Sequence, residues 1–181
     1  MLKAITDRYP IEHHLEDGAK ITCSLMTADD REPLSKFLGR LHARDLLHLQ
    51  VDITKPEAQE NWLRHIEEGR SVCICAYDPA TMVGYASVHV SEKNGIRSGE
   101  IRVNISQGYR SRGLGKILTR EIFTVAKLLQ LKSVYARMMD DQPGAKAAFK
   151  RLGFVEDPGQ RKPARDQAGR PGDLIVMTAR P

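Results

Sequence analysis

Residues 108–116 read GYRSRGLGK, and an apolar-periodic run at residues 116–131 follows them. Two glycines, Gly113 and Gly115, stand at the start of the helix that this run predicts. The first turn of a helix leaves backbone N–H groups without partners inside the helix, and the helix dipole places partial positive charge there. A glycine-rich turn that opens a helix is therefore a typical binding site for a phosphate or pyrophosphate.

Two better-known phosphate loops do not fit this turn. Gly108 and Gly113 have the glycine spacing of a nucleotide P-loop, but Leu114 stands where that loop requires lysine. A dinucleotide-binding fingerprint requires a third glycine, and Leu118 holds that position. The turn therefore belongs to another class of phosphate site.

The remaining pattern is Arg110-x-x-Gly113-x-Gly115, and a strand-like run at residues 99–105 precedes it. This pattern resembles motif A of the GNAT superfamily of N-acetyltransferases, (Q/R)-x-x-G-x-(G/A). The order of elements around it, strand, turn and long helix, agrees with that resemblance.

A second segment resembles the same superfamily. Residues 142–152 predict an alanine-rich helix, and the family pattern there is N-x-x-A-x-x-x-Y-x-x-x-G-F. The matching positions are Ala145, Gly153 and Phe154. Two positions differ, because Gln142 stands near the family asparagine and Phe149 stands where most members carry tyrosine. The resemblance covers roughly residues 20–180, and its specific part is confined to about residues 99–155.

Hydrophobic periodicity alone indicates an α/β or α+β chain, because it does not determine strand order. The resemblance implies a GNAT-like mixed, mostly antiparallel sheet of six to seven strands with helices on both faces. We expect a partly ordered lead-in at residues 1–18 and a single N-acetyltransferase domain at residues 19–181. The expected strands are 19–26, 71–77, 82–90, 99–105, 132–137 and 173–178, and the expected helices are 28–44, 56–68, 114–131 and 142–152.

The resemblance implies acetyl-CoA as the acetyl donor and co-substrate. Backbone N–H groups across residues 110–116 would hold its pyrophosphate, and glycine lets the chain approach closely. The strand edge at residues 103–105 would pair with the pantetheine arm, and one of its N–H groups would stabilise the thioester oxygen. The expected cofactor-binding residues are Val103, Asn104, Ile105, Arg110, Ser111, Arg112, Gly113, Leu114, Gly115, Lys116, Gln142 and Phe149.

Acetyl transfer to an amine requires loss of the ammonium proton. Glu100 is the expected catalytic base, because it lies on the strand where many superfamily members carry a glutamate base. Alternation places Glu100, Arg102 and Asn104 on one face of that strand. The alternative is that this is only the polar face of a half-buried strand, with Arg102 weakening the glutamate as a base. Glu92 and Glu121 are further candidates of lower rank.

Phe149 changes the expected chemistry, since the family tyrosine is thought to protonate the departing thiolate and phenylalanine has no proton to give. Water can still protonate a thiolate of pKa near 8.5. The expected function is direct transfer of acetyl to a primary amine in a ternary complex. A non-catalytic acyl-CoA sensor or regulatory domain is the alternative. The acceptor stays open between a protein lysine, a protein N-terminus and a small amine.

Charge and composition limit the other partners. The net charge is +5, and residues 157–172 form a basic stretch rich in Pro, Gly, Arg and Gln, which predicts a long mobile loop. This loop would bind the acceptor or cover the cofactor, or it is merely a solvated loop. No aromatic residue interleaves the basic ones, which disfavours nucleic-acid binding. No apolar run approaches the roughly 20 residues of a membrane span, so we expect a cytoplasmic protein without membrane contact.

The cysteines and histidines do not form a metal-binding pattern. Cys23, Cys73 and Cys75 cannot all pair, and each lies in a run that predicts a buried strand. The six histidines are scattered without the spacing of a zinc site. We therefore expect reduced core cysteines and no metal, and a homodimer stays open.

Overall fold

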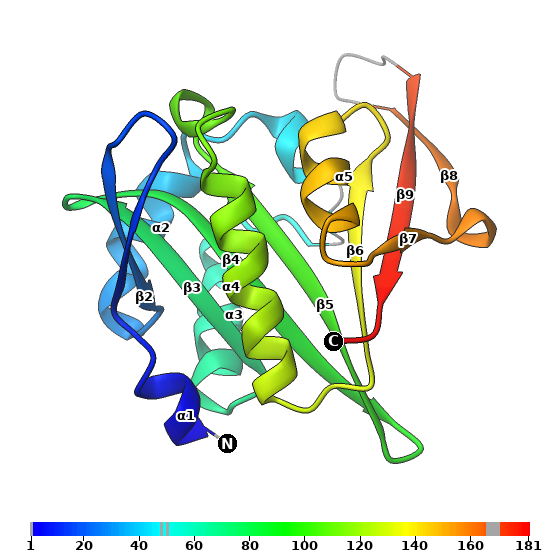
Figure 1. Cartoon of the computed structure of the whole chain (residues 1–181), viewed down its shortest axis with the longest axis horizontal. Helices are drawn as coiled ribbons and strands as arrows, with labels where there is room; N and C mark the ends of the chain where they lie inside the picture. The colour runs from blue at the N-terminus through cyan, green and yellow to red at the C-terminus, as the bar shows by residue number, and fades with distance from the viewer. Residues whose placement is uncertain (1, 48, 50, 166–170) are drawn as a thin grey trace.

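The structure is a computed structural model, and it describes residues 2–47, 49, 51–165 and 171–181. Across these residues a nine-stranded sheet has the order β1-β2-β3-β4-β5-β6-β9-β7, and β8 pairs with β9 (Figure 1). The strands are β1 (Ile11–His14), β2 (Lys20–Leu25), β3 (Ser71–Asp78), β4 (Thr81–Lys93), β5 (Ile96–Ile105), β6 (Ser133–Met139), β7 (Val155–Glu156), β8 (Lys162–Arg165) and β9 (Pro171–Ala179). The expected count of six to seven is too low, because the short strands β1, β7 and β8 have no clear alternation of their own.

The sheet is mostly antiparallel, as expected, and β5 with β6 is its parallel pair among the described strands. A parallel pair requires a crossover, and helix α4 (Leu114–Leu128) supplies it. The glycine-rich turn therefore lies at the end of β5, where the chain leaves the sheet to start α4.

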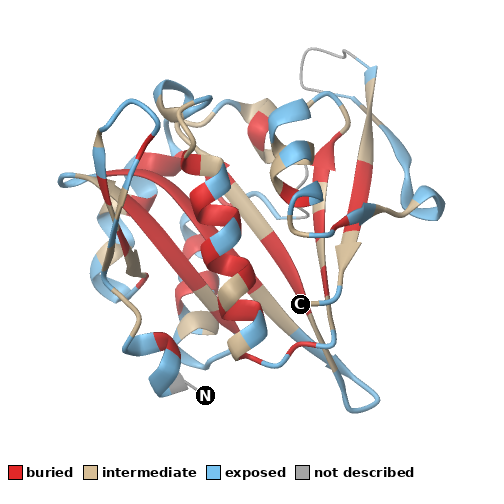
Figure 2. Ribbon diagram, in the orientation of Figure 1, coloured by how far each residue is buried: buried red, intermediate tan, exposed pale blue. Residues whose placement is uncertain are grey.

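Helices cover both faces of the sheet, which confirms the expected mixed α/β architecture. The other helices are α1 (Leu2–Thr6), α2 (Arg31–Leu38), α3 (Pro56–Glu67) and α5 (Pro143–Lys150). On one face α4 buries an apolar stripe that includes Leu118 and Ile122, and this stripe forms one core with the sheet (Figure 2). On the other face Phe37 of α2 and Trp62 of α3 pack edge-on against Tyr85, with ring centroids 5.9 and 5.0 Å from it. None of the described helices has the length and apolar character needed to cross a membrane.

The β4–β5 hairpin is longer than expected. Its strands pair without interruption from Gly84 with Ile105 to Lys93 with Ile96. The turn is Asn94-Gly95, and both residues have positive φ, 52° and 73°. An Asn-Gly dipeptide is the usual signal for such a tight hairpin. The apolar pattern does not indicate that the two strands continue to the turn, because the residues near the hairpin end are mostly polar.

The lead-in at residues 1–18 is more structured than expected. It contains α1 and β1, and β1 pairs antiparallel with β2. Ile5 and Leu15 are 2% and 4% exposed and belong to the main core. This segment therefore packs as part of the fold.

The first expected helix, 28–44, is shorter in the structure. Thr27 caps the 3₁₀ turn η1 (Ala28–Asp30), which leads directly into α2, since its side chain accepts from the Asp29 N–H while Asp30 accepts from the Thr27 N–H. Helix α2 then ends at Leu38, before Gly39. A separate 3₁₀ turn, η2 (Ala43–Leu46), follows, and it reaches the site described below.

The basic stretch at residues 157–172 is largely ordered where the structure describes it. A 3₁₀ turn and β8 occupy residues 158–165, and residues 166–170 lie outside the described residues. Arg161 forms ion pairs with Asp140, Glu156 and Asp173, at 3.2, 2.9 and 2.7 Å. The expectation of a mobile loop is therefore wrong for residues 158–165, because a strand partner and these acids hold them.

Candidate active site

A cavity of about 580 Å³ lies where β5 and β6 separate. The two strands pair only as far as Ile101 with Ala136, although both continue beyond these residues. Val103 and Ile105 line the cavity from the α4 side of the sheet, and Asn104 lines it from the opposite side. The gap between the strands thus gives the cavity access to both faces of the sheet.

The turn before α4 forms one end of the cavity. Gly113 is the N-cap, in the left-handed conformation with φ 89°, and no side chain caps the helix. Ser111 also has positive φ, 56°. Among the described residues, no side chain is found to accept from the first N–H groups of α4, and an anion site requires such free donors. Ser111, Gly113, Gly115 and Lys116, which the sequence predicts to bind the cofactor, line the cavity.

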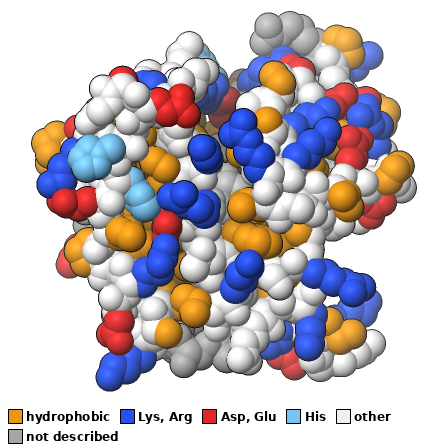
Figure 3. Space-filling model, in the orientation of Figure 1, with side chains coloured by type: hydrophobic (Ala, Val, Ile, Leu, Met, Phe, Trp, Pro, Cys, Tyr) orange, Lys and Arg blue, Asp and Glu red, His pale blue; other side chains and the backbone are white. Residues whose placement is uncertain are grey.

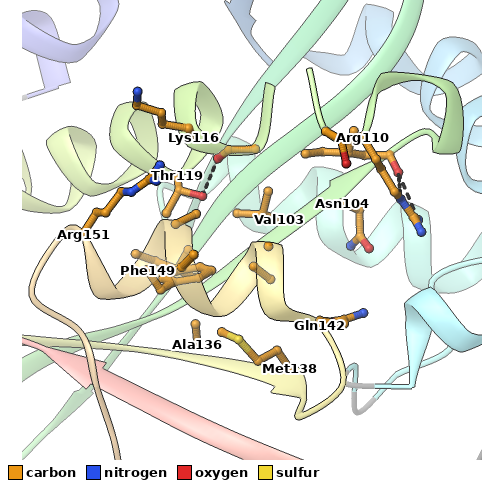
Figure 4. A pocket seen from close by; sticks show the side chains of 18 of the residues that line it. Val103, Asn104, Arg110, Lys116, Thr119, Ala136, Met138, Gln142, Phe149 and Arg151 are labelled. Atoms are coloured by element: carbon orange, nitrogen blue, oxygen red, sulfur yellow. Dashed lines mark hydrogen bonds between the residues drawn. The ribbon is translucent and has the colours of Figure 1, made fainter. Parts of the chain in front are cut away.

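Two cations stand at this end of the cavity. Lys116 lies in the first turn of α4, and Arg151 directly follows α5. Figure 4 shows both side chains at the same end, on either side of Thr119. Both are exposed, and no ion pair to either is found among the described residues. The sequence did not predict Arg151 as a site residue. Its only signal there is that it is a basic residue at the end of an alanine-rich helix.

An apolar section forms the middle of the cavity. Its walls are Val103 of β5, Ala136 and Met138 of β6, and Phe149 of α5 (Figure 4). Phe149 is 4% exposed, and its ring packs edge-on against Phe154 with centroids 4.9 Å apart. This section can accept an extended, largely apolar arm.

Figure 4 shows three further polar side chains on the side of the cavity away from Lys116 and Arg151, namely Asn104, Gln142 and, from the turn before α4, Arg110. The Asn104 amide donates to the Tyr85 hydroxyl at 2.7 Å. The Arg110 guanidinium donates to the Ile105 carbonyl at 3.3 Å.

Arg110 also approaches Asp45 at 2.7 Å, between guanidinium nitrogen and carboxylate oxygen. Asp45 belongs to η2, lines the cavity and is 8% exposed. The sequence reasoning missed Asp45 because it placed this residue directly after a single long helix.

Two predicted cofactor residues, Arg112 and Leu114, do not line the cavity. The Arg112 guanidinium pairs with Asp17 at 2.5 Å and lies 4.7 Å from the centre of the Tyr109 ring. This pairing holds the pKa of Asp17 below its usual range. Leu114 is fully buried in the main core. Any contribution of these two residues to phosphate binding would come from their backbone.

Glu100 lies beside the cavity and not in its wall. Its carboxylate is 7% exposed, and it accepts from Arg102 at 2.7 Å and from Arg137 at 3.0 Å. Arg137 lines the cavity, whereas Glu100 and Arg102 do not. Arg137, which contacts the Glu100 carboxylate, therefore lies between the predicted base and the cavity.

A model of the acetyltransferase (GNAT) family matches residues 38–154. The chain belongs to this family. None of the curated proteins matches its sequence.

Solved structures of GNAT proteins resemble the structure of this chain. The GNAT domain of PAT from S. lividans has a TM-score of 0.75 at 14% identity, covering 94% of this chain and 96% of that one. YncA, a putative acetyltransferase from Salmonella typhimurium solved with acetyl-CoA, has a TM-score of 0.70 at 17% identity, with 88% and 93% covered. Spermidine N-acetyltransferase from Vibrio cholerae, solved with CoA and spermine, has a TM-score of 0.68 at 16% identity, with 88% and 95% covered. At these identities the similarity establishes the GNAT fold.

The two lower-ranked candidate bases lie outside this GNAT cavity. Glu121 is 1% exposed on α4, where its carboxylate accepts from Arg8 at 2.7 Å and from the Tyr9 hydroxyl at 3.1 Å. It therefore fastens the N-terminal segment to α4. Glu92 is exposed near the tip of the β4–β5 hairpin.

The three cysteines of the GNAT domain are free thiols and buried. Burial raises the pKa of Cys23 to about 12, so that this thiol stays protonated at neutral pH. Over the described parts of the chain, no group of three or more His, Cys, Asp or Glu side chains is arranged to hold a metal ion.

Proposed function

We propose that the protein transfers an acetyl group from acetyl-CoA to a primary amine by direct attack within a ternary complex. The observation that carries this proposal is the single cavity that joins the open N-terminus of α4 to the gap between β5 and β6. Such a cavity offers an anion site, an apolar section and a strand edge in the order of pyrophosphate, pantetheine and thioester. Membership of the GNAT family supports the same assignment.

The pyrophosphate of CoA would bind the backbone N–H groups at residues 110–116, with Lys116 and Arg151 adding positive charge. Figure 3 shows Lys and Arg side chains gathered over α4 and α5 on the face seen in Figure 1. The pantetheine arm would lie along the unpaired edge of β5 and against Phe149. An N–H group of residues 103–105 would then stabilise the thioester oxygen as charge develops on it.

Glu100 stays our proposed proton acceptor, acting through water because its carboxylate is outside the cavity wall. The amine must lose its proton before or during attack on the thioester carbon, and the bond from that carbon to sulfur then breaks. No tyrosine is found among the described residues that line the cavity. Water would therefore protonate the departing thiolate.

Lys116 and Arg151 provide the test of the cofactor site. We expect Lys116→Ala and Arg151→Ala each to raise the KM for acetyl-CoA about 5- to 20-fold with little change in kcat, because each loses a charge-assisted contact to phosphate. Steady-state kinetics with a panel of primary amines measures this. Lys36→Ala, on the exposed Lys36–Glu32 pair, is the matched control.

The absence of a hydroxyl at Phe149 favours a second candidate, a non-catalytic acyl-CoA sensor. Acetyl-CoA binding without turnover over amines and peptides would support the sensor. An unchanged KM in both cation variants would instead contradict the proposed phosphate site.

A further inference from the structure

Two arginines share one buried carboxylate on the face of the sheet opposite α4. Arg102 and Glu100 lie on β5, and Arg137 lies on β6 across the gap. Each guanidinium contacts a different oxygen of Glu100, Arg102 at 2.7 Å and Arg137 at 3.0 Å. The Arg137 guanidinium also lies 5.3 Å from the centre of the Tyr135 ring. These contacts hold Arg137 in one position.

The cluster carries more positive than negative charge. The side chains of Arg102, Arg137 and Glu100 are 15%, 20% and 7% exposed. The Nε atom of Arg102 is buried without a hydrogen-bond partner among the described residues. A buried cation that lacks its own counterion is costly, because it has lost solvent without gaining a full partner. The two guanidinium groups thus share one carboxylate, and Arg137, the one that lines the cavity, can take an additional anion.

Other acidic groups of the cavity do not supply this anion. Asp45 is paired with Arg110, and Asp141 is paired with Arg44. Glu16 lies against Gly113, at the α4 end of the cavity. Of the shared cluster, Arg137 is the member that lines the cavity. An anion that enters the gap between β5 and β6 would therefore meet Arg137.

We propose that Arg137 binds a carboxylate of the acetyl acceptor, and that the acceptor is a small amine bearing that carboxylate, such as an amino acid. This inference rests on the proposed acetyl transfer. Arg137 lies on the face opposite α4, whereas the pyrophosphate site lies at the α4 N-terminus, so the carboxylate and the CoA phosphates have separate cations. A polyamine would bring further positive charge to this cluster, and a lysine side chain carries no carboxylate near its amine.

Matched acceptor pairs test the proposal. We would measure kcat/KM for L-alanine, L-leucine, L-phenylalanine and L-glutamine, and for the amide of each, with wild-type protein and Arg137→Gln. Because the amides have less basic amines, the informative quantity is the acid-to-amide ratio in wild type divided by that in the variant. We expect this quotient to be about tenfold or more. The KM for acetyl-CoA should be unchanged, and Arg137→Lys should restore part of the preference.

Arg70→Gln, which removes an exposed cation paired with Glu68, is the matched control and should leave the ratio at the wild-type value. An equal loss of kcat on acids and amides would mean that Arg137 acts on the thioester and would overturn the proposal. An unchanged ratio in Arg137→Gln would overturn it as well.

A binding measurement keeps the test independent of turnover. Calorimetry on the CoA-saturated protein would compare N-acetyl-L-leucine with its amide. Tighter binding of the acid that is lost in Arg137→Gln supports the subsite, even if no acetyl transfer is observed. Equal or absent binding of the two compounds contradicts it, while failure to bind acetyl-CoA would contradict the proposed function instead.

Discussion

At the level of single residues, the neighbours of Glu100 limit the access of water to its carboxylate. Both of its oxygens accept from arginines, and its side chain is 7% exposed. Proton transfer to such a carboxylate requires that water reach it past Arg137. Glu100 also positions Arg137. A substitution at Glu100 can therefore remove a proton acceptor or displace Arg137, and kinetics can separate these two effects.

If Glu100 accepts the proton, Glu100→Gln should lower kcat about 10²-fold or more near neutral pH, because general-base catalysis contributes on that scale. Measurement of kcat and kcat/KM from pH 6 to pH 9 tests this. Turnover equal to wild type over that whole range would exclude Glu100 as the base.

Arg102→Gln is the control for this prediction, since it removes one partner and keeps the carboxylate. A similar fall in kcat in both variants would assign the effect to the arrangement of the Arg102, Glu100 and Arg137 side chains and not to proton transfer by Glu100.

At the level of elements, two neighbouring hairpins hold the turn that opens α4. The Glu16 N–H, between β1 and β2, donates to the Arg112 carbonyl at 3.0 Å. The Tyr109 hydroxyl donates to Asp78, at the β3–β4 turn, at 2.7 Å. The turn is therefore oriented by contacts to distant parts of the chain as well as by its glycines.

Gly113 and Gly115 should respond differently to alanine. Gly113 has φ 89°, and an added Cβ would lie 3.1 Å from the Glu16 side chain. We expect Gly113→Ala to lower the free energy of unfolding by about 1–2 kcal/mol and to raise the KM for acetyl-CoA. Denaturant unfolding and steady-state kinetics measure the two effects.

Gly115→Ala is the matched control, since Gly115 lies in α4 and its added Cβ would meet only the end of the Ile105 side chain, at 3.2 Å. We expect it to leave stability nearly unchanged. Equal destabilisation by both alanines would show that the left-handed conformation of Gly113 is not the cause.

At the level of the whole molecule, the N-terminal segment is fastened to the long helix that starts at the site. Arg8 and Tyr9 contact the buried Glu121 carboxylate on α4. Glu121 is 2% exposed in its side chain, while Arg8 is 33% exposed. We therefore expect a chain that begins at residue 19 to be less stable than the full chain, because Glu121 would lose these partners.

Arg8→Met should destabilise the protein by about 2–3 kcal/mol, less than a fully buried pair because Arg8 is partly solvated. The cause would be the loss of the arginine partner at 2.7 Å, which leaves the buried Glu121 carboxylate with the Tyr9 hydroxyl at 3.1 Å and His13 at 3.5 Å. Urea unfolding at pH 7 measures this change. The double variant Arg8→Met with Glu121→Gln should recover part of the loss, and no recovery would contradict the charge explanation.

The local pattern predicted the parts of the fold that depend on neighbours in sequence. The motif at residues 110–115 and the periodic run after it correctly indicated a GNAT fold and the start of α4 at Leu114. The Thr27 cap and the β3–β4 hairpin were also correct, because side-chain capping and turn preference act over a few residues. The ends of α2 and of the β4–β5 hairpin were placed wrongly, since apolar periodicity says little where polar residues continue an element.

Sequence alone thus determined the family, the glycine-rich turn at the start of α4 and the strand that borders the cavity, since each depends on consecutive residues. Tertiary structure decided which side chains face the cavity. It turned Arg112 toward Asp17, brought Asp45 and Arg151 to the cavity, and placed Arg137 between Glu100 and the gap. These contacts join residues far apart in the chain. They depend on the point where β5 and β6 separate, and no pattern of consecutive residues predicts that point.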